Sequence, residues 1–396
     1  MSDLTDLENK YYMQVARRQP VVIVRGEGTR VWDENEKEYL DFTSGWAVNT
    51  LGHCHPVLVR AIEEQARTLM QTSNQFYTVP QVKLAQLLVE NSCLDRVFFS
   101  NSGAEANEGV VKLARKYGKT HRNGAYEIIT ALNSFHGRTL TMAAATGQPA
   151  YQEQWQPLAP GFVNVPYDDI EAIKGATNSL TCAVMLEPVQ GEGGVNIPSP
   201  DYLKQVRAWC DEQGLVMVLD EVQTGIGRLG TLFGYQRFGV EPDAITLAKG
   251  LGGGVPIGAF MAKEEFCVLA PGDHGSTFGG NALTCAGAFA VVDYVVQNDI
   301  PAHADTVGQH LKEGLNALAS RYEIINEVRG MGLLIAVQFN SDISGQVVSL
   351  CNEEGLLLNP VRPNAIRFMP PLNVSTQEVD TALERLGRAL SKVVSG

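Results

Sequence analysis

Two apolar runs of strand length each end at one charged residue, and these two residues could do chemistry together. The run Leu215–Leu219 leads into Asp220, and Ile245–Ala248 leads into Lys249. Burial disfavours the ammonium form, so Lys249 could lose its proton and form a Schiff base with a cofactor aldehyde. Asp220 could keep a pyridinium nitrogen protonated, which makes the ring an electron sink. Either residue alone is explained as a solvated strand end, but the pair, with Gln223 placed to reach a ring hydroxyl, indicates pyridoxal phosphate chemistry.

Two further turns are suited to bind a phosphate. A strand-like run leads into Ser102, Gly103 and Ala104 at the expected start of a helix, where free N–H groups and the helix dipole favour an anion. The loop around Ser276 and Thr277 is rich in glycines and hydroxyls, which can approach a phosphate closely. By itself the first turn is an ordinary helix cap and the second a surface connection. Beside a lysine and an acid, both become candidates for phosphate binding.

Another turn contains an aromatic residue and, three positions later, an arginine. Phe135 could stack on a planar ring, and Arg138 could hold a substrate carboxylate with two hydrogen bonds. Phe135 is equally well explained as a core residue, so Arg138 is the sharper signal. Glu192 and Arg367 lie far apart in the sequence, and nothing in their spacing joins them.

Composition and charge exclude several classes of function. The chain has 396 residues and a formal net charge of −13, so we expect neither a general nucleic-acid binder nor a protein that binds anionic membranes. The seven cysteines are scattered and show no C-x-x-C spacing, so we expect no disulfide framework and no metal site. No apolar run approaches the roughly 18 residues of a membrane span, and we expect a cytoplasmic protein.

The elements that must position these residues alternate in type. From about residue 58 to 290, strand-like runs alternate with amphipathic helical stretches, a pattern typical of an α/β sheet with helices on its faces. Ligands of such sheets collect beyond the carboxyl ends of the strands, where the candidate residues lie. We expect an N-terminal segment (1–55) that packs with a small α+β domain (296–396), and a large, mostly parallel cofactor-binding domain (56–295). Its expected strands are 96–100, 127–131, 183–187, 215–220 and 244–248.

These motifs resemble the class III, or ω-amino acid, aminotransferases, which have the type I pyridoxal phosphate-dependent transferase fold. Within that family the resemblance is strongest to the acetylornithine group, and it extends over nearly the whole chain. The segments that carry it are 41–45, 47–49, 52–56, 101–107, 135–139, 219–230, 247–254, 275–281 and 367–372.

The resemblance implies a role for each residue around the cofactor ring. Lys249 would carry pyridoxal 5'-phosphate and shuttle the proton between the substrate and the cofactor. Asp220 would pair with the pyridinium nitrogen, Gln223 would contact the ring hydroxyl, and Val222 and Phe135 would enclose the ring from its two sides.

The resemblance also implies how the phosphate is bound. Ser102, Gly103 and Ala104 would hold it within the chain. Thr277 would contact the phosphate of the neighbouring subunit, so a homodimer with shared active sites is implied.

Substrate binding would depend on two arginines. By resemblance, Arg138 anchors the distal carboxylate of both substrates, with help from Ser276. Arg367 binds the carboxylate on the reacting carbon of glutamate, and Glu192 neutralises this arginine when the other donor is bound. Trp46 stands where we expect an aliphatic residue in acetylornithine enzymes, and this indole could reshape the pocket.

The implied reaction moves the terminal amino group of N2-acetylornithine to 2-oxoglutarate, giving N-acetylglutamate 5-semialdehyde and glutamate in arginine biosynthesis. Ornithine, 4-aminobutyrate and an acetylated lysine intermediate are alternative donors. A pyridoxal phosphate mutase or racemase would need no 2-oxo acid, and the presence of Arg367 with Glu192 argues against it. A non-catalytic binding protein is a third class, against which Lys249, Asp220 and Arg138 argue.

Overall fold

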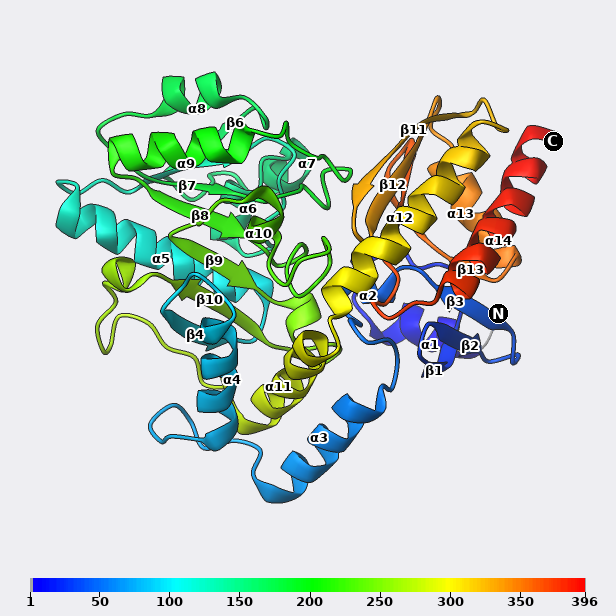
Figure 1. Ribbon diagram of the computed structural model, residues 1–396, viewed down its shortest axis with the longest axis horizontal. Helices are drawn as coiled ribbons and strands as arrows, with labels where there is room; N and C mark the ends of the chain where they lie inside the picture. Colours follow the sequence, from blue (N-terminus) through cyan, green and yellow to red (C-terminus); the bar gives the residue numbers. More distant parts are fainter. Residues whose placement is uncertain (1–2, 396) are drawn as a thin grey trace.

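A seven-stranded sheet is the largest element of the computed structural model, which describes residues 3–395 (Figure 1). Its strand order is β4-β10-β9-β8-β7-β5-β6. Only β10 runs antiparallel to its neighbours, so the expected mostly parallel sheet is confirmed. The strands are β4 (Arg96–Ser100), β5 (Glu127–Ala131), β6 (Phe162–Val165), β7 (Thr181–Leu186), β8 (Val216–Asp220), β9 (Ala244–Leu247) and β10 (Gly258–Ala262).

Helices cover both faces of this sheet. The apolar side chains of strand β8 show why, because they point to both faces and must be buried on each. Successive side chains of a strand point to opposite faces. Met217 and Leu219 lie in the same core cluster as the helix α9 (Tyr202–Gln213), whereas Val216 and Val218 lie in the cluster that contains apolar residues of α5 (Gly103–His121). Because both faces are buried, the strand is a continuous apolar run rather than an alternating one.

The remaining helices of this part surround the sheet and carry the connections to the smaller part. Helix α11 packs against α3 and α4, below the sheet in Figure 1. The helices of this part other than α5 and α9 are α3 (Pro56–Thr68), α4 (Val79–Glu90), α6 (Leu140–Ala145), α7 (Pro149–Gln152), α8 (Ile170–Ala176), α10 (Gly234–Phe238) and α11 (Ala282–Gln297). Three 3-10 turns accompany them, η1 (Glu153–Trp155), η2 (Lys249–Leu251) and η3 (Glu264–Phe266).

Two four-stranded sheets form the smaller part, and one of them joins the two ends of the chain. Strand β3 pairs in parallel with β13, so the N-terminal strands lie beside the C-terminal elements (Figure 1). The sheets have the orders β1-β2-β3-β13 and β11-β12-β15-β14. Their elements are α1 (Asp3–Tyr11), β1 (Ile23–Glu27), β2 (Arg30–Asp33), β3 (Glu38–Asp41), α2 (Ser44–Ala47), α12 (Ile300–Ala319), β11 (Ile325–Met331), β12 (Leu334–Phe339), α13 (Ser344–Glu353), β13 (Leu356–Leu357), β14 (Asn359–Arg362), β15 (Ala365–Phe368) and α14 (Thr376–Ser395).

This pairing agrees with an N-terminal segment that packs with the C-terminal elements, and the boundaries at residues 55 and 295 stay our proposal. Every helix among the described residues is too short or too polar to cross a membrane.

The short helix α2 is left-handed. The φ angles of Ser44, Gly45, Trp46 and Ala47 are 47°, 62°, 64° and 64°, and the amide of Val48 donates to the Ser44 carbonyl over 2.8 Å. Each non-glycine residue in this conformation costs about 1–2 kcal/mol, so neighbouring contacts must hold the turn.

The carboxylate of Asp41 supplies such contacts at the start of the turn. Its Oδ1 accepts hydrogen bonds from the amides of Thr43 and Ser44, each over 2.9 Å. The other oxygen, Oδ2, lies 2.8 Å from Nε2 of His53. The turn therefore starts from a buried and fully bonded acid, and it ends next to Val48, which lines the cavity described below.

Candidate active site

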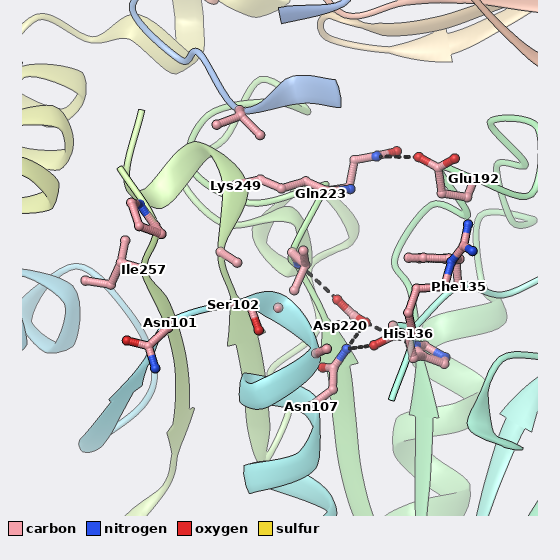
Figure 2. A pocket seen from close by; sticks show the side chains of 18 of the residues that line it. Asn101, Ser102, Asn107, Phe135, His136, Glu192, Asp220, Gln223, Lys249 and Ile257 are labelled. Atoms are coloured by element: carbon pink, nitrogen blue, oxygen red, sulfur yellow. Dashed lines mark hydrogen bonds and ion pairs between the residues drawn. The ribbon is translucent and has the colours of Figure 1, made fainter. Parts of the chain in front are cut away.

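A cavity of about 420 Å³ lies where β8 and β9 end (Figure 2). The start of α5, the turn after β5, the loop after β8 and η2 contribute to its walls. Most of the residues predicted from the sequence meet here. They are Ser102, Gly103, Ala104, Phe135, Arg138, Glu192, Asp220, Val222, Gln223 and Lys249.

Lys249 lines the cavity and is separated from the end of β9 by Ala248. Its φ angle is 42°, a left-handed conformation that turns the chain from the strand into η2. Burial lowers the pKa of Lys249 more than the charge of Glu192 raises it. Within residues 3–395 its ammonium makes no hydrogen bond and no ion pair, so the structure leaves this nitrogen available for chemistry.

Asp220 ends β8 and is held by three hydrogen bonds. Its Oδ1 accepts from the amide of Val222 over 3.0 Å. Its Oδ2 accepts from Asn107 Nδ2 over 2.8 Å and lies 2.8 Å from His136 Nδ1. Figure 2 shows Asn107 and His136 on the same side of the carboxylate. The acid is 3% exposed, so these contacts fix both its position and its orientation.

His136 holds Asp220 through a buried contact between its imidazole and the carboxylate. Burial lowers the pKa of His136, but the hydrogen bond with Asp220 and the negative charge of that residue outweigh burial and raise it.

Sequence reasoning did not assign a role to Asn107 or His136. Asn107 is a buried polar residue on the apolar face of α5, beside Ala106 and Val110, and this break in the pattern is the signal that could have identified it. His136 lies between two residues of interest, but its partner is 84 positions away in the sequence.

Glu187 is another residue that the sequence prediction missed. It is buried after β7 and accepts hydrogen bonds from the amides of Phe135 and Gly191, over 3.1 and 3.3 Å. Burial raises the pKa of Glu187 to about 7. One carboxyl group therefore connects the turn that carries Phe135 with the loop that carries Glu192.

The first turn of α5 forms a compact cup. The hydroxyl of Ser102 caps the helix by accepting from the amide of Glu105 over 3.2 Å. A Cβ added to Gly103 would lie 2.8 Å from Cγ1 of Val222, so only glycine permits this approach of the helix to the loop after β8. The amides of Gly103 and Ala104 are left at a helix N-terminus on the cavity wall, as phosphate binding requires.

Arg367 and Glu192 form an ion pair beside the cavity. The guanidinium is fully buried on β15, and its Nη2 lies 2.8 Å from Oε1 of Glu192. Gln223 connects the pair. Its Oε1 accepts from Arg367 over 2.9 Å, and its Nε2 donates to Glu192 over 3.1 Å (Figure 2). Burial raises the pKa of Glu192, but the charges of Arg367 and Lys249 outweigh it and lower the pKa to about 2.

Arg138 differs from Arg367 in having no acidic partner among the described residues. It is exposed and lines the cavity, where its guanidinium lies 4.3 Å from the ring centroid of Tyr151 and 5.5 Å from that of Phe135. An unpaired guanidinium at a cavity wall is suited to a carboxylate of a ligand.

Besides Arg367, three predicted residues do not line the cavity of their own chain. Trp46 is 60% exposed on the left-handed turn, and Val48 lines the cavity in its place. Thr277 lies exposed in its loop, where its carbonyl accepts from Gln71. The hydroxyl of Ser276 accepts a hydrogen bond from Nδ2 of Asn101 over 3.2 Å. Their roles toward a substrate or a second subunit stay predictions.

The cavity fits pyridoxal 5'-phosphate. Its volume of about 420 Å³ is within the range of cofactor sites. Lys249 would hold the cofactor covalently, and the fixed Asp220 would meet the pyridine nitrogen. The first turn of α5, with Gly103 packed closely on Val222, would take the phosphate.

Comparison with known proteins agrees with this geometry. The family described as Aminotransferase class-III matches residues 11–390. The acetylornithine aminotransferase of Caldanaerobacter subterraneus subsp. tengcongensis is 50% identical over 387 residues, 98% of either chain, and that of Methanocaldococcus jannaschii is 48% identical over 390 residues, again 98% of either chain. The structure of ornithine aminotransferase from Toxoplasma gondii has a TM-score of 0.96 at 35% identity, covering 99% of this chain and 95% of that one. The chain therefore belongs to the class III aminotransferases, the pyridoxal phosphate-dependent transaminases of the type I fold.

Proposed function

We propose that this enzyme moves the terminal amino group of N2-acetylornithine to 2-oxoglutarate, giving N-acetylglutamate 5-semialdehyde and glutamate, a reaction of arginine biosynthesis. The observation that carries this proposal is the unequal state of the two arginines. Arg367 is paired with Glu192 at 2.8 Å, whereas Arg138 has no acidic partner among the described residues.

One free and one neutralised arginine suit acetylornithine. The reacting carbon of this donor carries no carboxylate, so a bare Arg367 beside it would be a buried charge without a partner. Glu192 removes that cost. The only carboxylate of acetylornithine is distant from the reacting carbon, and Arg138 binds it in a bidentate contact.

Glutamate uses the same two arginines differently. Its distal carboxylate takes the place at Arg138, and its second carboxylate, on the reacting carbon, displaces Glu192 from Arg367. Nε of Arg367 has no hydrogen-bond partner among the described residues, so this guanidinium can donate a further hydrogen bond to the incoming carboxylate. The movement of one glutamate side chain thereby lets one cavity accept two substrates of different shape.

Lys249 moves the proton. When bound, pyridoxal phosphate supplies the electron sink that makes the hydrogen on the reacting carbon acidic. Because burial lowers the pKa of Lys249, its Nζ can accept this proton in the neutral form and return it. Asp220 stays oriented by His136 and Asn107, and Phe135 and Val222 restrict the ring between them.

The comparisons favour acetylornithine over the other donors. The relatives that match at 46–50% identity carry its name. Ornithine would also bring a second ammonium group to the cavity. Acetylation removes that charge.

We also propose a homodimer with shared active sites, in which Thr277 contacts the phosphate bound by the partner subunit. Large apolar side chains are exposed next to Thr277 and in the segment that is hydrogen-bonded to its loop through Gln71 and Asn74. The adjacent Phe278 is 63% exposed, and Phe76 and Tyr77, in the segment that precedes α4, are 64% and 97% exposed. A second copy of the chain would bury this surface. A cytoplasmic location is proposed from the biosynthetic reaction.

The experiment that tests the donor is a half-reaction without any keto acid. The absorbance spectrum of the purified holoenzyme is recorded before and after addition of N2-acetylornithine. We expect the visible band of the lysine-bound cofactor to disappear and the band of its aminated form to take its place. Lys249→Ala is the control, and it should show no such change.

Glutamate, ornithine and 4-aminobutyrate are compared in the same assay. An enzyme that responds to glutamate but ignores acetylornithine would remain a transaminase with a different amine donor.

A further inference from the structure

The carboxylate-binding arginine of the cavity is held by an aromatic ring that the reaction itself does not require. Tyr151 lies on α7, outside the residues that line the cavity. Its ring centroid is 4.3 Å from the guanidinium carbon of Arg138, closer than the 5.5 Å to Phe135. The two rings meet edge to face at 5.7 Å. Arg138 thus lies over two aromatic rings instead of against an acid.

The helix that carries Tyr151 is fixed on both sides of this residue. Before it, Gln148 donates from Nε2 to the carbonyl of Ser134 over 2.8 Å, which ties α7 to the turn that carries Arg138. After it, Gln152 donates to the carbonyl of Thr146 over 2.8 Å and to Asn164 over 3.1 Å. Both anchors act through side chains that flank Tyr151, so the backbone that carries the ring is held next to the turn of Arg138.

The hydroxyl of Tyr151 makes no hydrogen bond to the described residues, so the contact depends on the face of the ring. A cation over such a face is attracted by its quadrupole, and a free arginine side chain has many rotamers to lose when it binds a carboxylate. Stacking restricts those rotamers before the substrate arrives. An acid in the same place would restrict them too, but it would compete with the substrate carboxylate.

We propose that Tyr151 is a positioning residue for substrate carboxylates: its ring holds the guanidinium of Arg138 in the orientation that binds the distal carboxylate, without neutralising it. This inference rests on the proposed role of Arg138 in binding that carboxylate. It does not depend on which amine donor the enzyme uses, because glutamate also carries a distal carboxylate.

The test compares donors with and without a distal carboxylate. Rate constants for the half-reaction of the holoenzyme are measured for glutamate, N2-acetylornithine and L-alanine with the unmodified protein, Tyr151→Leu and Tyr151→Phe. L-Alanine has only the carboxylate on its reacting carbon. Trp155→Leu removes an exposed aromatic residue of the next turn and serves as the matched control.

We expect Tyr151→Leu to lower the apparent second-order rate constant for glutamate by about fivefold, as a cation–π contact of ordinary strength implies. The same loss applies to acetylornithine. The rate constant for L-alanine should stay within twofold of that of the unmodified protein. Tyr151→Phe keeps the ring face, so its rate constant for glutamate should equal that of the unmodified protein. Trp155→Leu should change none of the three rate constants.

Equal losses for glutamate and L-alanine in Tyr151→Leu would overturn the proposal, because Tyr151 would then act through Phe135 and the cofactor rather than through Arg138. A Tyr151→Leu enzyme that keeps its full glutamate rate would overturn it as well. If acetylornithine fails with the unmodified protein while glutamate reacts, the proposed donor is wrong and the glutamate comparison still decides the role of Tyr151.

Discussion

Replacing Glu192 with glutamine should change which substrate the cavity prefers. In the unmodified enzyme a glutamate molecule must displace Glu192 before its carboxylate can reach Arg367. Glutamine is similar in size but neutral, so Glu192→Gln leaves Arg367 without a counterion. Acetylornithine then binds beside an uncompensated buried charge, and glutamate binds without competition.

The size of the effect can be worked out from the ion pair. The pKa of Glu192 is about 2 instead of its ordinary 4.5, and this difference corresponds to about 3 kcal/mol of net favourable interaction. If all of it were expressed in substrate choice, the ratio of the two specificity constants would change by about a hundredfold. Because Glu192 is 28% exposed and water can partly replace it, we expect a tenfold change or more in favour of glutamate.

The assay is the stopped-flow absorbance of the two half-reactions, each measured without its co-substrate. The ratio of kcat/KM for glutamate to that for acetylornithine is the quantity compared. Glu171→Gln is the control, because it neutralises an acid of similar chemistry that pairs with Lys174 on the surface. A Glu192→Gln enzyme whose ratio stays within twofold of the unmodified value would refute the idea that Glu192 neutralises Arg367 selectively.

Three further predictions concern residues around the cofactor site. Burial raises the pKa of Glu221 to about 7, so the folded chain binds the proton of this carboxyl group more tightly than the unfolded chain does. The contribution of this protonation to the free energy of unfolding is present below pH 4.5 and is lost as the pH rises to about 7. Glu221→Gln should therefore gain up to about 3 kcal/mol relative to the unmodified protein across that window, measured as the change of the Tm difference with pH. Gly103→Ala should weaken cofactor binding at least tenfold in a spectral titration, because the added Cβ would lie 2.8 Å from Val222. Gly175→Ala is the control and should leave cofactor binding unchanged, because a Cβ at Gly175 would have no atom within 4 Å. His136→Gln should lower kcat about a hundredfold with little change in KM, since it removes the imidazole that holds the buried Asp220 over 2.8 Å. Equal kcat values for the two proteins would contradict this.

The sequence predicted the parts of the site that depend on a strand ending in a charge. Asp220 and Lys249 were predicted from largely apolar runs, because a charged side chain at the carboxyl end of a buried parallel strand lies where ligands of such sheets collect. Strands β4 and β5 have the bounds that were expected. Strands β6 and β10 were missed. The five residues of β10 follow a stretch of glycine and proline, which is typical of a loop.

Contacts that form only when distant segments meet could not be predicted. Glu187 joins two loops through their backbone amides, and no side-chain pattern records an amide donor. Gln223 was expected at the ring hydroxyl, and the structure shows it bonded to both members of the ion pair between Glu192 and Arg367. Only the family resemblance joined those two residues, which lie 175 positions apart in the printed sequence.

The left-handed turn of residues 44–47 limits how the entrance of this enzyme can be changed. At φ angles near 60°, asparagine, aspartate and glycine are tolerated, whereas valine, isoleucine and threonine are not. In a mutagenesis library at Trp46 that samples mainly β-branched aliphatic residues, most variants would therefore lose stability before their substrate preference could be tested. Because Val48 follows the turn and lines the cavity, any change of backbone handedness moves that wall with it. New substrate ranges at this position are accessible through small polar residues or glycine, and directed evolution should begin with them.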